Sequence, residues 1–171
     1  MEGQKVQGRE ETEVSVGTTR TAFERLFVGD IRAAGQLAKV NPVRIRTVVS
    51  VCEEKIEVRG EGIAYLQISI RDTHPVPFEK IDQVINAIAR NIPAGPVLIR
   101  CAGGMSRSPV MTAVYFDLVR WRTFDELLRQ LSAVRTVVDP SPILMRSARE
   151  YLRIRTEEER TGTHPHWESA I

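Results

Sequence analysis

One continuous stretch, PVLIRCAGGMSRSPVMTAVYFDLVRW over residues 96–121, decides how the rest of the chain is interpreted. A short apolar run over residues 96–101 predicts a buried strand, because turn-forming residues bound it. Residues 106–121 predict a largely buried helix with Pro109 in its first turn, where proline is tolerated. Two adjacent glycines in the intervening loop permit backbone turns that bulkier residues resist. The stretch therefore predicts a strand, a tight loop and a helix start in direct succession.

Strand and helix patterns alternate on both sides of this stretch. Short apolar runs predict three further strands, over residues 24–30, 44–52 and 63–70. Helical spacing of apolar residues predicts four other helices, over residues 31–41, 78–92, 123–137 and 141–155. The alternation predicts an α/β fold with a central, mainly parallel twisted sheet of four to five strands flanked by helices.

The two ends of the chain are polar and are expected to lie outside this domain. Residues 1–20 lack hydrophobic periodicity and predict a flexible N-terminal arm, whereas residues 158–171 predict a polar C-terminal tail. The residues between these two ends, 21–157, are predicted to form one domain that is large enough to be a catalytic domain. No apolar run approaches the roughly 18 residues of a membrane span, and the first residues lack a signal-peptide core. We therefore expect a cytoplasmic protein with no membrane partner.

Charge and ligand-type residues restrict the possible partners. The 24 basic and 22 acidic residues leave a net charge of +2, too small to indicate a nucleic-acid partner. Two cysteines in a cytosolic chain are expected to be reduced. His164 and His166 are too weak a pattern to indicate a metal, so no metal and no cofactor is expected. The sequence predicts no particular oligomeric state.

The loop between strand and helix has the properties of an anion site. Successive backbone N–H groups in a tight loop form a concave anion cradle, and a helix N-terminus adds partial positive charge. Arg107 can bind two phosphate oxygens with its guanidinium fork. Cys101, at the base of this loop, would experience positive potential, which favours the thiolate form. The loop predicts a thiolate nucleophile aimed at a bound tetrahedral oxyanion; the alternative is an inert buried cysteine.

Cys101, Arg107 and Ser108 together form a Cys-x5-Arg-Ser motif. This motif resembles the signature of the cysteine-dependent protein phosphatases, and the form CAGGMSRSP resembles their dual-specificity branch. The resemblance continues in order through LFVGD, TVVSVCE and ISIRDT, covering about three quarters of the chain. It implies a dual-specificity phosphatase-like fold. It also implies hydrolysis of phosphotyrosine, with phosphoserine and phosphothreonine as further candidates.

The resemblance also implies a role for each matching position. Cys101 would attack phosphorus and form a phosphocysteine, Arg107 would stabilise the transition state, and Ser108 would hydrogen-bond the sulfur. Asp72 would protonate the leaving oxygen and then activate water. The phosphate would be bound through the loop residues Ala102, Gly103, Gly104, Met105, Ser106 and Arg107. No cofactor is implied, and the partner would be a phosphoprotein or phosphopeptide substrate.

Asp72 also has a geometric argument and a simpler alternative. It follows the strand predicted over residues 63–70, and one helix separates that strand from the one before Cys101. Two such strands can be neighbours in a parallel sheet, with ligands bound at their carboxyl ends. The alternative is that Asp72 is only a turn residue or a helix cap. Five other aspartates are predicted to be caps or solvated helix residues: Asp30, Asp82, Asp117, Asp125 and Asp139.

Two features depart from the family pattern or extend it. Arg100 stands where the family has histidine; it can supply positive charge to the loop or point away from it. Met105 can form an apolar wall of the pocket or pack inward. No residue of the variable loop is basic, which ranks lipid substrates below phosphoproteins. The alternatives are a phosphate-binding pseudophosphatase, or the same chemistry on an inositol phosphate, a nucleotide or an RNA 5′ end.

Cys52, at the end of the run over residues 44–52, has two interpretations. A buried apolar residue is the simpler one, since free cysteines are often buried. The resemblance offers another, because some members of the superfamily have a cysteine there that forms a reversible disulfide with the nucleophile. In that case Cys52 would be a redox partner of Cys101.

Overall fold

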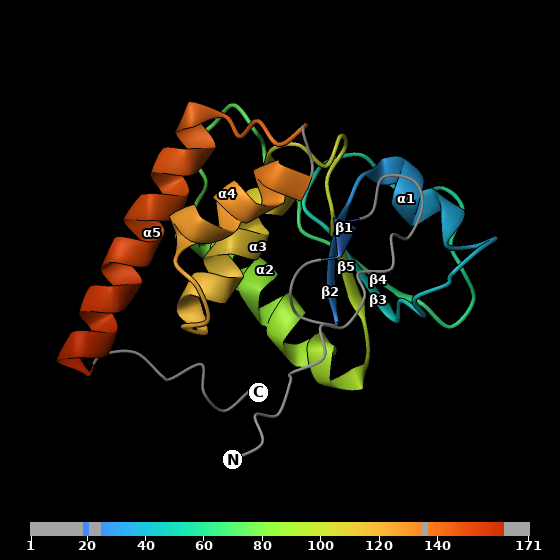
Figure 1. Cartoon of the computed structure of the whole chain (residues 1–171), viewed down its shortest axis with the longest axis horizontal. Coiled ribbons are helices and arrows are strands. Elements are labelled where there is room, and N and C mark those ends of the chain that lie inside the picture. Colours follow the sequence, from blue (N-terminus) through green and yellow to red (C-terminus); the bar gives the residue numbers. More distant parts are fainter. Residues whose placement is uncertain (1–18, 21–24, 135–136, 163–171) are drawn as a thin grey trace, which may run out of the picture.

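A five-stranded sheet lies at the centre of the computed structural model, which describes residues 19–20, 25–134 and 137–162 (Figure 1). Its strands are β1 (Thr19–Arg20), β2 (Leu26–Gly29), β3 (Thr47–Ser50), β4 (Ala64–Gln67) and β5 (Val97–Arg100). The order across the sheet is β1-β2-β5-β3-β4. All neighbouring pairs are parallel except β1 with β2. The predicted α/β class and mainly parallel sheet are therefore confirmed.

Helices cover both faces of the sheet. They are α1 (Ile31–Gln36), α2 (Phe78–Asn91), α3 (Arg107–Leu118), α4 (Phe124–Val134) and α5 (Pro142–Thr161), with a short 3-10 turn, η1 (Ile92–Ala94). In Figure 1, α1 lies on one side of the sheet and α2 to α5 on the other. α2 and α3 contact the strands, while α4 and α5 pack against α3. The sheet therefore lies between a thin layer formed by α1 and a thicker layer formed by α2 to α5.

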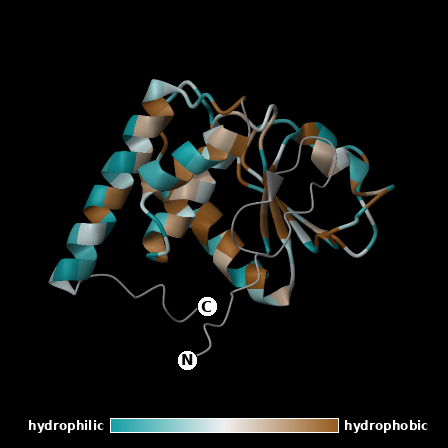
Figure 2. Cartoon of the chain, in the orientation of Figure 1, coloured by the Kyte–Doolittle hydropathy of each residue, from teal (hydrophilic) through white to brown (hydrophobic). Residues whose placement is uncertain are grey.

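The alternation of side chains along β5 divides the core into two parts. Ile99 belongs to the larger core, beneath α2 and α3, and Leu98 belongs to the smaller core on the side of α1. Successive strand residues point to opposite faces, so Cys101 follows Ile99 and Arg100 follows Leu98. Figure 2 shows the central strands in hydrophobic colours and α5 in alternating hydrophobic and hydrophilic colours. β5 therefore carries two adjacent chemical groups to opposite sides of the sheet.

Several predicted boundaries differ from the structure. The helix predicted to reach Asn41 ends at Gln36; the Asn41 side chain instead binds both the N–H and the C=O of Ile45, at 2.7 and 2.9 Å, which closes a turn. The helix predicted to end at residue 155 continues to Thr161 and is closed by Gly162, whose φ of 72° suits a glycine. Residues 158–161 are thus helical rather than tail.

Thr19–Arg20, predicted to belong to the N-terminal arm, form β1 and pair with Phe27 and Val28 of β2. The remainder of the predicted arm and tail, residues 1–18 and 163–171, lies outside the described residues. Within the part of the chain that the structure describes, no helix combines the length and the apolar character needed to cross a membrane.

Two of the five aspartates predicted to be caps or solvated helix residues have different outcomes. Asp30 caps α1 by accepting the N–H of Ala33 at 2.8 Å, as predicted. Asp82 is neither a cap nor simply solvated: it accepts the Tyr151 hydroxyl at 2.6 Å and pairs with Arg155. Tyr151 is completely buried, so its hydroxyl needs a hydrogen-bond acceptor, and Asp82 provides it. This contact joins α2 to α5.

Candidate active site

The loop over residues 101–106 joins the carboxyl end of β5 to the start of α3 and lies at the centre of the sheet edge. β5 is flanked by β2 and β3, so the loop is supported on both sides. Gly104 has φ of 65°, a left-handed conformation that favours glycine. Ser106, the N-cap of α3, makes no side-chain cap bond, so the first N–H groups of α3 have no side-chain acceptor there. Such N–H groups favour an anion.

Cys101 and Ser108 lie in direct contact at the base of the loop. The distance from Cys101 Sγ to Ser108 Oγ is 3.2 Å, and both side chains are buried. Ser108 Oγ also lies 3.4 Å from the carbonyl oxygen of Gly29. A serine hydroxyl has one proton, which it can direct to either acceptor. The predicted serine–sulfur contact is therefore present, and Ser108 can donate to a thiolate at Cys101.

Arg107 brings an unsatisfied donor to the same loop. Its Nη1 donates to the Ile70 carbonyl at 3.1 Å, which fixes the direction of the side chain. Its Nε is buried and has no hydrogen-bond partner among the described residues. Buried donors are almost always paired, because leaving one unpaired costs about 1–3 kcal/mol. Together with the uncapped start of α3, this donor fits an oxyanion bound above Cys101.

Asp72 reaches the loop by a route that differs from the predicted one. β4 ends at Gln67, so Asp72 lies in a loop beyond the strand rather than at its end. β4 is also partly exposed at the sheet edge, not buried. The predicted adjacency of the two strands is wrong, because β3 lies between β4 and β5. The connection through α2 skips one strand position.

A side-chain hydrogen bond nevertheless connects Asp72 to the Cys101 loop. Ser106 Oγ donates to Asp72 Oδ1 at 2.6 Å, which brings the carboxylate to the edge of the loop that holds Cys101 and Arg107. The sequence reasoning assigned Ser106 only a phosphate-binding role in the loop. The structure adds that its hydroxyl positions Asp72.

Ser141 is a site residue that sequence reasoning missed. Its N–H donates to Ser106 Oγ at 3.1 Å and its hydroxyl donates to the Asp72 carbonyl at 2.6 Å. The same hydroxyl accepts the N–H of Leu144, which caps α5. The sequence signal was present only as a serine before Pro142, a pattern typical of a helix start. Nothing in it indicated contact with a loop far away in the chain.

Arg100 points away from the loop. It is completely buried on the other face of the sheet, where Nε donates to Ser50 Oγ at 2.7 Å and Nη2 donates to the Glu54 carbonyl at 2.6 Å. Nη1 donates to Cys52 Sγ at 3.1 Å. Of the two alternatives for Arg100, the structure supports the second. Arg100 connects the ends of β5 and β3 instead of lining the anion site.

Cys52 is completely buried, in agreement with the simpler interpretation, and both cysteines are free. Burial raises the pKa of the Cys52 thiol to about 11, although the positive charge of Arg100 opposes this rise. Its pairing with Cys101 stays a prediction.

The remaining loop residues form the wall of the site. Ala102 accepts the N–H of Ile31 at 3.1 Å, which ties the loop to the start of α1. Met105 is 46% exposed and lies against Gly103, so it packs outward at the rim rather than inward. Its carbonyl accepts the N–H of Asp139 at 2.9 Å. Over the described ranges, no group of three or more His, Cys, Asp or Glu residues could hold a metal ion.

Comparison with known proteins agrees with this geometry. No family model matches the chain. Dual specificity protein phosphatase 15 of Rattus norvegicus is 27% identical over 128 residues, which cover 74% of this chain and 54% of that protein. Dual specificity protein phosphatase 13B of Homo sapiens is 28% identical over 132 residues, covering 70% and 65% of the two chains. This chain thus spans about half to two thirds of these curated relatives.

Among solved structures, the crystal structure of DUSP15 superposes with a TM-score of 0.75 at 24% sequence identity. The superposition covers 91% of this chain and 97% of that one. The chain is a sequence relative of the dual-specificity protein phosphatases and has their fold.

Proposed function

We propose that the chain is a phosphoric monoester hydrolase, a protein phosphatase that hydrolyses phosphotyrosine, with phosphoserine and phosphothreonine as further substrates. One observation carries the proposal: the free sulfur of Cys101 lies at the base of a loop that leads into the uncapped start of α3, where Arg107 has a buried Nε with no hydrogen-bond partner among the described residues. Two donor types, the guanidinium of Arg107 and the backbone N–H groups of the loop and the start of α3, suit the charge of a phosphoryl group.

In the first step the Cys101 thiolate attacks phosphorus. A P–S bond forms while the ester P–O bond breaks, and the phosphoryl group passes to sulfur as a phosphocysteine. The backbone N–H groups of residues 102–107 and the Arg107 fork bind the three non-bridging oxygens throughout. Donors fixed before the reaction stabilise the transition state without reorganising, which makes this type of stabilisation large.

Asp72 would supply and then remove the proton. One of its oxygens is held by Ser106, which leaves the other to protonate the departing alkoxide or phenoxide. In the second step the same carboxylate takes a proton from water, water attacks phosphorus, and the P–S bond breaks. Ser108, 3.2 Å from the sulfur, donates a hydrogen bond to the thiolate as it leaves. Inorganic phosphate is the product, and the starting protonation states are restored.

The first test is turnover of p-nitrophenyl phosphate by the wild type and by Cys101→Ser. We expect the substitution to lower turnover by about a thousandfold or more, because the attacking thiolate is removed. Rapid acid quench should trap a phosphorylated Cys101 in the wild type. Metal-dependent activity that survives Cys101→Ser would contradict the proposal.

Two further measurements on the wild type distinguish the alternative functions. Tight phosphopeptide binding without any phosphocysteine would identify a phosphate-binding pseudophosphatase instead. A panel containing phosphopeptides, inositol phosphates, nucleotides and an RNA 5′ end tests the substrate class. Hydrolysis confined to a non-protein phosphate would retain the chemistry and reject the phosphoprotein substrate.

A further inference from the structure

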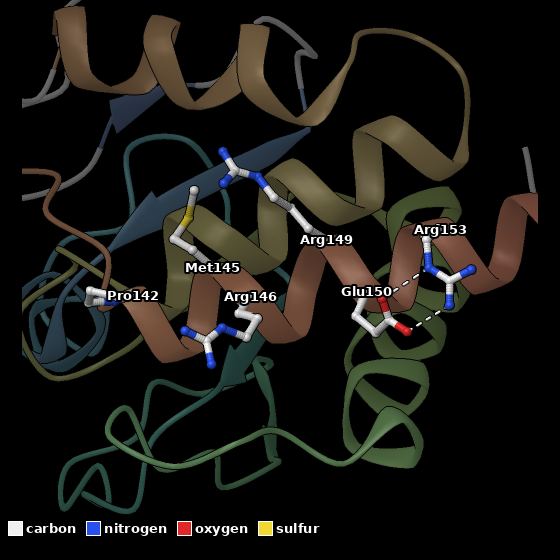
Figure 3. A pocket seen from close by; sticks show the side chains of 6 residues that line it. All are labelled: Pro142, Met145, Arg146, Arg149, Glu150 and Arg153. Carbon is white, nitrogen blue, oxygen red and sulfur yellow. Dashed lines mark hydrogen bonds and ion pairs between the residues drawn. The ribbon is translucent and has the colours of Figure 1, made fainter.

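A groove runs along the exposed side of α5 from Pro142 to Arg153 (Figure 3). It encloses about 450 Å³. Its lining residues are Pro142, Met145, Arg146, Arg149, Glu150 and Arg153. We infer that this groove binds acidic residues that flank the phosphorylated residue of a peptide substrate. The inference rests on the proposed phosphatase function and names a sequence preference for it.

The groove has an excess of available positive charge. Three of its residues are arginines and one is a glutamate, which leaves a net charge of +2. Arg146 is exposed and has no ion-pair partner within the described part of the chain. Arg149 pairs with Asp125 at 2.8 Å and Arg153 with Glu150 at 2.7 Å, but all four side chains are about half or more exposed. Exposed pairs contribute little, so these arginines can accept incoming carboxylates at small cost.

The groove begins next to a residue that contacts the Cys101 loop. Its first residue, Pro142, directly follows Ser141, which is hydrogen-bonded to both Ser106 and Asp72. A peptide whose phosphate lies above Cys101 therefore passes the start of α5 when it leaves the site on that side. No separate element has to move to connect the two regions.

The spacing of the arginines suits an extended peptide. At a rise of about 1.5 Å per residue, Arg146, Arg149 and Arg153 lie about 6, 10 and 16 Å beyond Pro142 along the helix axis. An extended chain advances about 3.3 Å per residue, so these distances correspond to roughly two to five peptide positions. Acidic residues about two to five positions beyond the point where the peptide reaches Pro142 would face them.

The same spacing disfavours a single compact anion. Figure 3 shows Arg146 directed to one side of α5 and Arg149 to the other, with Arg153 further along beside Glu150. Three charges distributed over a length of about 10 Å cannot converge on one phosphate. Pro142 and Met145 add apolar contact between them, which suits the carbon chain of a peptide. The groove therefore fits carboxylates arranged along a peptide better than a phosphorylated headgroup.

The test compares two phosphotyrosine peptides that differ only in charge. One carries Asp or Glu at positions two to six on each side of the phosphotyrosine, and the other carries Asn or Gln there. We expect the wild type to hydrolyse the acidic peptide with about tenfold higher kcat/KM, mainly through KM, and the preference to shrink as salt increases. The double variant Arg146→Gln/Arg153→Gln should lose most of this preference and keep p-nitrophenyl phosphate turnover within about twofold.

Arg90→Gln provides the matched control. Arg90 is exposed in the last turn of α2, at the opposite end of the sheet from the Cys101 loop. Equal kcat/KM for the two peptides in the wild type would overturn the inference, as would equal loss of preference in the control. Faster hydrolysis of inositol phosphates that depends on Arg146 and Arg153 would overturn it too. Absence of p-nitrophenyl phosphate turnover in the wild type would instead reject the proposed function.

Discussion

Arg100 and Cys101 are neighbours in the chain but have opposite roles in the structure. Strand alternation places the Cys101 side chain on the face of the sheet covered by α2 and α3 and the Arg100 side chain on the opposite face. There Arg100 donates to Ser50, Cys52 and the Glu54 carbonyl. The same alternation, applied to the sequence, could have predicted that Arg100 turns away from the site. The consequence is that Arg100 supports the sheet edge, and Arg107 alone is the arginine proposed to contact the phosphoryl group of the substrate.

This role predicts that Arg100→Met lowers stability more than catalysis. Methionine approximates the buried volume but leaves the Ser50 hydroxyl and the Glu54 carbonyl without their donor. We expect the free energy of unfolding to fall by about 2–4 kcal/mol in denaturant titrations. The pKa of Cys52 should rise further, since the opposing positive charge is gone. Turnover by the folded protein should change less than about tenfold.

Arg90→Met, at an exposed position, is the control and should stay within about 0.5 kcal/mol of the wild type. A large loss of kcat in Arg100→Met with unchanged stability would show that Arg100 acts on the reaction instead.

Ser106 predicts a leaving-group effect. Ser106→Ala removes the hydroxyl that holds Asp72 Oδ1 and accepts the Ser141 N–H. A mispositioned acid matters most when the leaving oxygen is strongly basic. We therefore expect kcat to fall about tenfold with a phenyl phosphate and much less with p-nitrophenyl phosphate. Asp72→Asn should show the same dependence on the leaving group, only larger; an equal loss for both substrates in Ser106→Ala would refute the positioning role.

At the scale of elements, α5 supports the molecule in two ways. Its first turn is tied to the Asp72 loop through Ser141, and its middle is tied to α2 through Tyr151 and Asp82. Tyr151 is completely buried and also packs edge-on against Phe78. Arg155 completes the contact by pairing with Asp82 and, at 2.6 Å, with Glu158. Residues along α5, from its first turn to Arg155, thus contact other parts of the fold.

The α2–α5 contact predicts a pH-dependent stability difference. Tyr151→Phe removes the hydroxyl bonded to Asp82 and should lower the free energy of unfolding by about 1–3 kcal/mol at pH 7. Burial and the Asp82 carboxylate raise the pKa of Tyr151 above its ordinary value. A raised pKa means that the contribution is complete at low pH and is lost as the pH rises above the unfolded value of about 10.

Denaturant titrations at pH 7 and pH 10.5 measure this effect. The difference in the free energy of unfolding between wild type and Tyr151→Phe should be smaller at the higher pH. Tyr65→Phe is a comparison at a partly exposed tyrosine whose hydroxyl accepts the Gly60 N–H. A gap that widens with pH would contradict the assignment.

At the scale of the molecule, local patterns predicted most elements but not their arrangement. The strand, loop and helix over residues 96–121 were predictable because each depends on neighbouring residues alone. The capping box at the start of α4, in which Thr123 and Glu126 bind each other's N–H groups, is equally local. Strand order is not local: nothing in the sequence of β4 shows that β3 separates it from β5. Position along the chain also gave no sign that Ser141 reaches Asp72.

The candidate site divides in the same way. Cys101, Arg107 and Ser108 come from one segment, so their spacing predicted their proximity. Asp72 was predicted through family resemblance, and its actual support by Ser106 and Ser141 required the folded structure. Long-range side-chain bonds of this kind leave no periodic pattern in a sequence.

Ser141 links three parts of the structure that lie far apart in the chain. Its backbone and side chain touch the loop of Asp72, the wall of the Cys101 loop and the first turn of α5. We expect a rigid-body displacement of the first turn of α5 to shift Asp72, the proposed proton donor, through these hydrogen bonds. A peptide bound in the proposed groove on α5 would then change how the proposed acid is aligned with the bond being broken.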